Sequence, residues 1–250
     1  MADQVTAESL RQLRSAVSGD ENGLPNHSDR SLSRFLRAKK DIARACKQVK
    51  AFDEFVEQRG YQTLAYADVE QYHEKRMLLV NPAVQTKSAE TILWLRPAIY
   101  RKTFDLREME KLLFYTLNWL TLTHEVVQRD GVALLADWSG FNMTNFNPAM
   151  PQTMLKVVQE IMPLRLKAIY IVNQPFMFSV ILRVVQVFMQ HKIRQRLHIL
   201  GDAAKLKEFI DDSSIPISLG GSLVGSDAEE YFLSCRDFLQ AGPDEQANPL

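Results

Sequence analysis

Apolar residues recur at every third or fourth position through the first third of the chain, and this spacing predicts amphipathic helices. The first helix is expected over residues 28–38, with Ser28 as its N-cap, and the second over residues 41–60. A third, short helix is expected over residues 68–76. We therefore predict an N-terminal helical subdomain over residues 1–80.

The pattern changes after Asn81 and Pro82, which are expected to break the chain. Short apolar runs then follow, typical of strands buried on both faces of a sheet, at residues 91–95, 132–136, 167–172 and 197–200. Helices are expected between and after them, at residues 105–129, 151–161, from 202 onward and 227–240. Strands that alternate with helices predict an α/β fold, a mostly parallel sheet flanked by helices, over residues 88–240, with a polar tail over 241–250.

The composition is that of an ordinary globular protein, with 46% hydrophobic and 24% charged residues in a chain of 250. The formal net charge is zero, so binding to nucleic acid or to an anionic membrane requires a local patch. Cys46 and Cys235 are too isolated to predict a disulfide framework or a metal site. No apolar run approaches the roughly 20 residues of a membrane span, and residues 1–15 lack the apolar core of a secretory signal. These features predict a soluble, cytoplasmic protein.

The segment 176–189 is apolar at every position except Ser179, Arg183 and Gln186. At 100° per residue, these three side chains fall with Gln190 on one narrow stripe of a helix. Two apolar rows occupy the rest of the helix surface. The row opposite the stripe consists of Phe178, Ile181, Val185 and Phe188, and the row on its flank consists of Phe176, Val180, Val184 and Val187.

A helix with two apolar rows has an apolar neighbour on both sides. One explanation is a helix buried deep in the core. The other is a lid, in which the row that contains Phe178 faces a cavity and the flanking row is free to contact a membrane.

Four segments resemble the motifs of the CRAL-TRIO lipid-binding family, in the order in which the family has them. They are Arg34-Phe35-Leu36-Arg37-Ala38, Asp137-Trp138-Ser139-Gly140, the run from Pro163 to Pro175, and Ile215-Pro216 with Leu219-Gly220-Gly221. The segment 191–198 is similar to the basic segment of the tocopherol-transfer and retinaldehyde-binding branch. The resemblance spans roughly residues 30–240 and implies a helical N-terminal subdomain, an α/β domain that encloses a lipid cavity, and a mobile lid.

Residues of several predicted elements are expected to line the cavity. Val132, Leu134 and Ala136 share one face of their strand, while Ala133 and Leu135 share the other. The resemblance implies that the inward-pointing residues also include Phe114, Asn118, Met154, Val157, Val158, Leu164 and Ile169. Asn118 would fix a hydroxyl or carbonyl of the ligand, and the alternative is a position on the outer surface of its helix. Leu164 stands where the phosphatidylinositol-transfer branch has a glutamate, which disfavours phosphatidylinositol as the ligand.

Lys192, Arg194 and Arg196 alternate along the chain and would project to one side of an extended segment. A solvated charged edge is the simplest explanation of such a run. The resemblance implies a cleft for a phosphoinositide head group, formed by Arg165, Lys167, Lys192 and Arg196, with Arg194 between them. The run lacks the interleaved aromatic residues of a nucleic-acid-binding surface, so no nucleic-acid partner is expected.

The sequence therefore predicts a carrier that binds one hydrophobic lipid, of tocopherol, retinoid, carotenoid or other apolar type, and transfers it between membranes. Transient association with phosphoinositide-containing membranes is expected, with no cofactor other than the bound lipid. The same pocket would serve a lipid-sensing scaffold or adaptor that regulates a partner without net transport. An enzyme that uses Asp137 with His124 or His198 is not favoured, because the chain lacks a nucleophile elbow, a glycine-rich phosphate loop and paired metal ligands.

Overall fold

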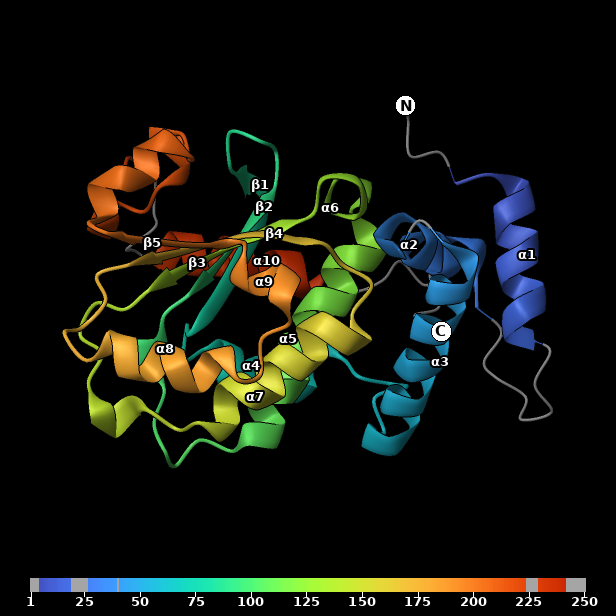
Figure 1. The fold of residues 1–250 in the computed structure, drawn as a ribbon, viewed down its shortest axis with the longest axis horizontal. Helices are drawn as coiled ribbons and strands as arrows, with labels where there is room; N and C mark the ends of the chain where they lie inside the picture. The colour runs from blue at the N-terminus through green and yellow to red at the C-terminus, as the bar shows by residue number, and fades with distance from the viewer. Residues whose placement is uncertain (1–4, 19–26, 40, 224–228, 242–250) are drawn as a thin grey trace.

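The computed structural model describes residues 5–18, 27–39, 41–223 and 229–241, and a five-stranded sheet lies at its centre (Figure 1). The strands lie side by side in the order of the chain: β1 (Leu78–Gln85), β2 (Thr91–Leu95), β3 (Val132–Asp137), β4 (Leu166–Val172) and β5 (Leu197–Gly201). β1 is antiparallel to β2, and the remaining neighbours are parallel. The predicted α/β class with a mostly parallel sheet is confirmed.

Strand β1 passes through the expected break at Asn81 and Pro82, so the sheet begins before residue 88. A proline is tolerated there because β1 lies at the edge of the sheet, where one side of the strand has no partner. The register with β2 is also irregular between Val80 and Gln85, around the proline.

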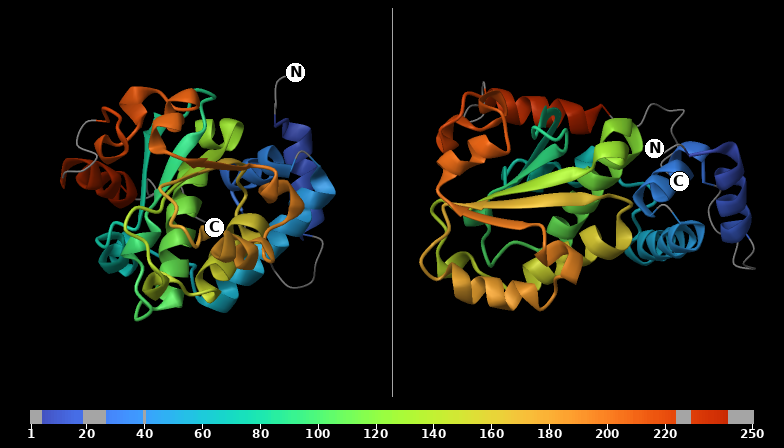
Figure 2. Two further views of the ribbon diagram at one scale, coloured as in Figure 1. Left: turned by 60° about the vertical axis from the view of Figure 1, so that its left-hand side comes forward. Right: turned by 45° about the horizontal axis from the view of Figure 1, so that its top comes forward.

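The two faces of the sheet are covered by different elements (Figure 2). Trp94 of β2, Leu135 of β3 and Tyr170 of β4 point to one face, where they pack with α10 (Glu229–Gln240) and the 3₁₀ segment Ala203–Glu208. The opposite face carries a second set of apolar side chains and is covered by helices of the middle of the chain. These are α5 (Leu106–Thr123), α7 (Ala149–Lys156), the π-helical turn Val157–Ile161, and α8 (Phe178–Gln186).

One long helix was expected over residues 105–129, and the structure has two. Asp105 caps the first, α5, by accepting a hydrogen bond from the backbone N–H of Arg107 at 2.8 Å. The backbone of His124 then becomes extended, with φ −115° and ψ 102°, and α6 (Glu125–Asp130) begins. Gly131 ends α6 with a φ of 88°, and a β-carbon there would lie 2.4 Å from the carbonyl oxygen of Arg165.

The N-terminal helices are α1 (Ala7–Ser18), α2 (Asp29–Lys39) and α3 (Ile42–Arg59), and α4 (Glu70–His73) is a single turn. Ser28 caps α2 by accepting from the N–H of Ser31 at 3.1 Å, and Asp41 caps α3. Gly60 ends α3 in the left-handed conformation. The boundaries predicted for α2 and α3 are thus confirmed. The helix expected from residue 227 is described from Glu229, and its first two residues, like most of the expected polar tail, lie outside the described residues.

A buried arginine connects α2 to α5. The guanidinium of Arg34 is fully buried, and its Nη1 donates to Oδ1 of Asn118 at 2.5 Å and to Oγ1 of Thr121 at 3.3 Å. It also lies over the rings of Phe35 and Phe52, 5.1 and 4.9 Å from their centroids. Burial lowers the pKa of Arg34 to about 9, although the nearby carboxylate of Asp53 acts in the opposite direction.

We expect Arg34→Ala to lower the free energy of unfolding by about 3 kcal/mol. The substitution removes the partner of a buried amide oxygen, which costs about 1–3 kcal/mol, and it leaves a cavity between two helices. Urea unfolding of the purified protein measures the change. Arg11→Ala is the control, because Arg11 forms an exposed pair with Glu8 and should change stability by no more than about 0.5 kcal/mol. Equal stability of the two variants would contradict a structural role for Arg34.

Candidate functional site

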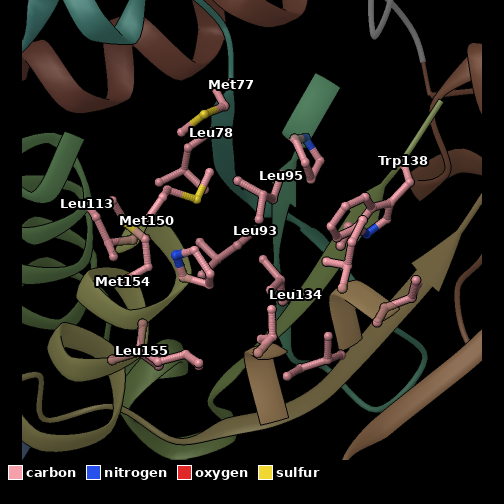
Figure 3. A pocket seen from close by; sticks show the side chains of 18 of the residues that line it. Met77, Leu78, Leu93, Leu95, Leu113, Leu134, Trp138, Met150, Met154 and Leu155 are labelled. Carbon is pink, nitrogen blue, oxygen red and sulfur yellow. The ribbon is translucent and has the colours of Figure 1, made fainter. Parts of the chain in front are cut away.

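An apolar cavity lies between the sheet and the helices on its second face (Figure 3). Its volume is about 190 Å³, and its wall is almost free of polar atoms. Figure 3 shows Leu93, Leu95 and Leu134 directed into this space from the strands, with Met150 and Met154 directed into it from α7. None of the described residues that line it is charged.

Alternation along the strands decides which residues reach the cavity. In β3, Val132, Leu134 and Ala136 line it, while Ala133 and Leu135 pack on the opposite face of the sheet. The structure places ten of the fourteen predicted pocket residues around the cavity. They are Val132, Leu134, Ala136, Met154, Val158, Leu164, Ile169, Phe178, Ile181 and Val185.

Phe114 and Asn118 lie on the other side of α5, away from the cavity wall. Phe114 stacks with Phe52 at a centroid distance of 5.6 Å and is almost fully buried. Asn118 accepts the hydrogen bond from Arg34. The helix is apolar on two faces, and the face with Met109 is the one that lines the cavity. Neither Phe114 nor Asn118 belongs to the wall, so Asn118 is not placed to hold a ligand hydroxyl.

Val157 and Phe188 also lie outside the wall. Val157 begins the π-helical turn and is fully buried in the core, next to Val158, which does line the cavity. Phe188 was assigned by counting 100° per residue, but α8 ends at Gln186 and the chain then turns. Met189 lines the cavity instead of Phe188.

Several cavity residues were missed because their elements were not assigned a cavity face. The alternation used for β3 applies equally to β2, and it would have identified Leu93 and Leu95. No local signal identifies the loop that follows β3. That loop contributes the lining residues Trp138, Phe141, Asn145, Phe146 and Asn147.

Helix α8 closes the cavity on the side that faces away from the sheet. Phe178 and Ile181 are buried against the cavity, and Val185 lines it from the next turn. Three members of the flanking row are exposed: Val180 in the helix at 51%, Phe176 just before it fully, and Val187 just after it at 74%, whereas Val184 is half-buried. Groups of large exposed apolar side chains are typical of surfaces that contact a membrane or another protein.

The basic residues do not form the alternating row expected from the sequence. His191–Arg194 is a helical turn, α9, so Lys192 and Arg194 point in different directions. The Arg194 Nε donates back to the carbonyl of Met189 at 3.1 Å. A guanidinium nitrogen of Arg196 donates to the carbonyl of Leu166.

The other two basic positions lie at the start of strand β4, where Arg165 immediately precedes the strand and Lys167 is its second residue. Arg165 donates to the carbonyls of Gln128 at 2.9 Å and of Arg129, at the end of α6. The guanidinium of Arg165 therefore has a structural role, because it connects the start of β4 to the end of α6. The side chain of Lys167 is exposed on the surface.

Three basic residues, from the N-terminal helices and from the segment after α8, lie near one another. Lys39 lies at the end of α2, Arg44 lies in the first turn of α3, and Lys192 lies on α9. The pKa of Lys39 is lowered because its ammonium group is partly buried and because the charges of Lys192 and Arg44 are near. We call Lys39, Arg44 and Lys192 the junction cluster. Like charges held together in this way favour the binding of an anion.

The side chains considered for acid–base chemistry have structural partners. Asp137 accepts from the N–H and the Oγ of Ser139, at 3.0 and 2.7 Å, and from Nδ2 of Asn173 at 3.1 Å. His124 bonds with the preceding threonine, and His198 packs between two aromatic rings on the far face of the sheet. In the described ranges, no three His, Cys, Asp or Glu side chains gather as metal ligands. No described helix is long and apolar enough to cross a membrane.

Comparison with solved structures shows a similar fold. A structure titled "Crystal structure of Sfh5" superposes with a TM-score of 0.66 over 87% of this chain and 88% of that chain, at 14% sequence identity. At this identity the likeness describes the fold alone.

Curated relatives match the chain over part of its length. The human alpha-tocopherol transfer protein-like is 28% identical over 123 residues, which cover 48% of this chain and 36% of that protein. Clavesin-2 from rat is 29% identical over 101 residues, or 39% of this chain and 31% of that protein. The chain therefore matches about a third of the length of these relatives. The model of the CRAL/TRIO domain matches residues 77–221, which include the whole sheet and helix α8, and the chain belongs to the CRAL/TRIO domain family.

Proposed function

We propose that this chain binds one hydrophobic lipid in the cavity under α8 and transfers it between membranes. The observation that carries the proposal is an apolar, uncharged cavity closed by a helix beside which large apolar side chains are exposed. Membership of the CRAL/TRIO family, whose members bind and transfer lipophilic ligands, supports it. Transfer changes no covalent bond, so the proposed activity requires neither a cofactor nor a catalytic residue.

Uptake of a lipid would require the lid to move. The cavity volume of about 190 Å³ is smaller than the range of about 300–1,000 Å³ that is typical of pockets for drug-sized ligands. Helix α8 is the element best suited to move, because Ser179, Val180 and Arg183 on its outer side are exposed to solvent. An apolar membrane surface would accept Phe176, Val180 and Val187 and would favour the open position.

We further propose that the junction cluster and Lys167 direct the lid to phosphoinositide-containing membranes. Lys192 of the cluster follows α8 closely in the chain, and a polyphosphate head group would relieve the repulsion among the three charges. Arg165 and Arg196 would support this surface by holding the backbone at the start of β4 and β5. The chain would then act in the cytosol and associate with membranes transiently.

The cavity can be tested by filling it. Ile169→Trp should abolish retention of co-purified lipid, because Ile169 points from β4 into the cavity and indole would occupy the ligand volume. Ile199→Trp is the matched control, since Ile199 is 47% exposed and lies outside the cavity wall. Mass spectrometry of organic extracts measures the lipid, and thermal unfolding verifies that each variant is folded. Equal lipid content in both folded variants would refute the assignment of this cavity as the lipid-binding site.

The junction cluster can be tested by removing two charges. Lys39→Ala with Lys192→Ala should weaken binding to vesicles that contain phosphatidylinositol bisphosphate by roughly 30-fold, at about 1 kcal/mol for each lysine. Lys102→Ala with Lys205→Ala removes the same charge from exposed positions elsewhere and should have a smaller effect. Vesicle co-sedimentation at two salt concentrations gives the affinities. Identical binding of the two double variants would show that charge at the junction has no special role.

The lid can be tested through the rate of transfer. Val180→Asp with Val187→Asp should slow the transfer of a fluorescent lipid to vesicles at least tenfold, because charged side chains oppose insertion at the interface. Equilibrium affinity in detergent should change little, since neither side chain lines the cavity. Ser179→Asp with Gln190→Asp places the same charges on the polar stripe and should slow transfer less. A rate that is unaffected by all four substitutions would mean that release does not involve the outer face of the lid.

A further inference from the structure

The wall of the cavity has almost no groups that can form hydrogen bonds. Among the described residues that line it, only Trp138, Asn145 and Asn147 carry a nitrogen or oxygen atom in the side chain. Because the wall exposes almost no polar atoms, a polar head group inside the cavity would have to use one of these three side chains or a rare exposed backbone group, or leave its own polar atoms unpaired.

The two asparagines are already engaged by the protein. Asn145 donates to the carbonyls of Ala98 at 3.1 Å and Tyr100 at 2.8 Å, and its Oδ1 accepts from the N–H of Asn142 at 3.1 Å. These bonds use both amide hydrogens of Asn145 and anchor the loop after β3 to the segment that follows β2.

Asn147 is engaged in the same region of the wall. Its Nδ2 donates to the hydroxyl of Tyr100 at 3.0 Å, and its Oδ1 accepts from the N–H of Ala149 at 3.0 Å. These bonds use one of the two amide hydrogens of Asn147, and a ligand that displaced either bond would remove a contact that holds the loop at the start of α7.

Trp138 presents its ring to the cavity and not its N–H. The ring packs edge-on against Phe141 and Phe178, with centroid distances of 4.6 and 5.0 Å. Its Nε1 is covered by protein atoms, although no hydrogen-bond partner is within reach. The amide of Asn118, which the sequence suggested for a ligand hydroxyl, is outside the wall and bound to Arg34.

We infer that the ligand of this cavity is a neutral hydrocarbon-like lipid, such as an isoprenoid chain or a polyene, without a hydrogen-bonding head group in its enclosed part. This inference rests on the proposed lipid-carrier function and names its substrate class. An apolar pocket discriminates by about 100-fold against an isosteric ligand that adds one hydroxyl, and a carboxylate is rejected more strongly because its charge must be desolvated.

A matched series of ligands tests the inference on the wild-type protein. Phytane, phytanol and phytanic acid share one branched chain and end in a methyl, a hydroxyl and a carboxylate. Each competes with the fluorescent polyene 1,6-diphenylhexatriene for the protein in a suspension of neutral phosphatidylcholine vesicles. We expect phytane to displace the polyene, phytanol to bind roughly 100-fold more weakly and phytanic acid to bind more weakly still.

The outcomes separate this inference from the function on which it rests. Equal or tighter binding of phytanol or phytanic acid overturns the hydrocarbon class and leaves the lipid-carrier function standing. Failure of the polyene and of all three chains to bind overturns both. Displacement in the expected order supports both.

A substitution in the wall provides a second measurement. Met150 is half-buried on α7 and lines the cavity, and Met150→Gln adds an unpaired amide with little change in volume. In this variant, the ratio of the affinity for phytane to the affinity for phytanol should fall at least tenfold. Met143→Gln, at a position 40% exposed and outside the wall, should leave the preference unchanged. An unchanged preference in the Met150 variant would overturn the assignment of selectivity to the wall.

Discussion

The central strands β2, β3 and β4 bury apolar side chains on both faces of the sheet, and packing fills only one of these faces completely. On the filled face, Trp94, Leu135 and Tyr170 pack with α10 and the neighbouring 3₁₀ turns. On the other face, the helices stand far enough from the sheet to leave a cavity between them. Apolar surface on both sides is what a buried parallel sheet requires, and here the same requirement supplies the cavity wall. Helix α8 lines the same cavity on the side that faces away from the sheet.

Arg34 has a corresponding role at the boundary between the N-terminal helices and the sheet domain. Its guanidinium fixes α2 against α5 through Asn118 and Thr121. The same α5 presents Met109, on its other face, to the cavity. One helix therefore links a polar, hydrogen-bonded core contact to an apolar wall. The amide of Asn118, which was expected to hold the ligand, is therefore bound to Arg34, and α5 contributes only apolar side chains to the wall.

The sequence predicted those parts of the fold that depend on neighbouring residues. The caps at Ser28 and Asp41 and the alternation in β3 are local patterns, and the structure has them where they were expected. Features that depend on distant residues were not accessible in this way. The path of β1 through Pro82 depends on pairing with β2, and the bond of Asn118 depends on Arg34, 84 positions away. The placement of Phe188 in the cavity wall was wrong for a related reason. Counting 100° per residue assumes that the helix continues, whereas α8 ends at Gln186. The resemblance to the CRAL-TRIO family predicted the cavity, but it did not specify which of the two apolar faces of α5 lines it.

The separation of cavity and junction cluster divides the proposed work between two kinds of interaction. Each buried methylene contributes about 0.8 kcal/mol, so a chain of about 15 carbons would gain on the order of 12 kcal/mol in the cavity relative to water. A hydrocarbon held this strongly would leave for water too slowly to be delivered, and it would leave readily only into another apolar phase. The uncharged wall cannot itself sense a membrane, whereas Lys39, Arg44 and Lys192 lie outside it, and Lys192 follows α8 closely in the chain. The positive charge of the junction cluster would thus determine which membrane is bound, and the exposed apolar side chains at α8 would insert into it. The lipid would then pass between two apolar environments without exposure to water.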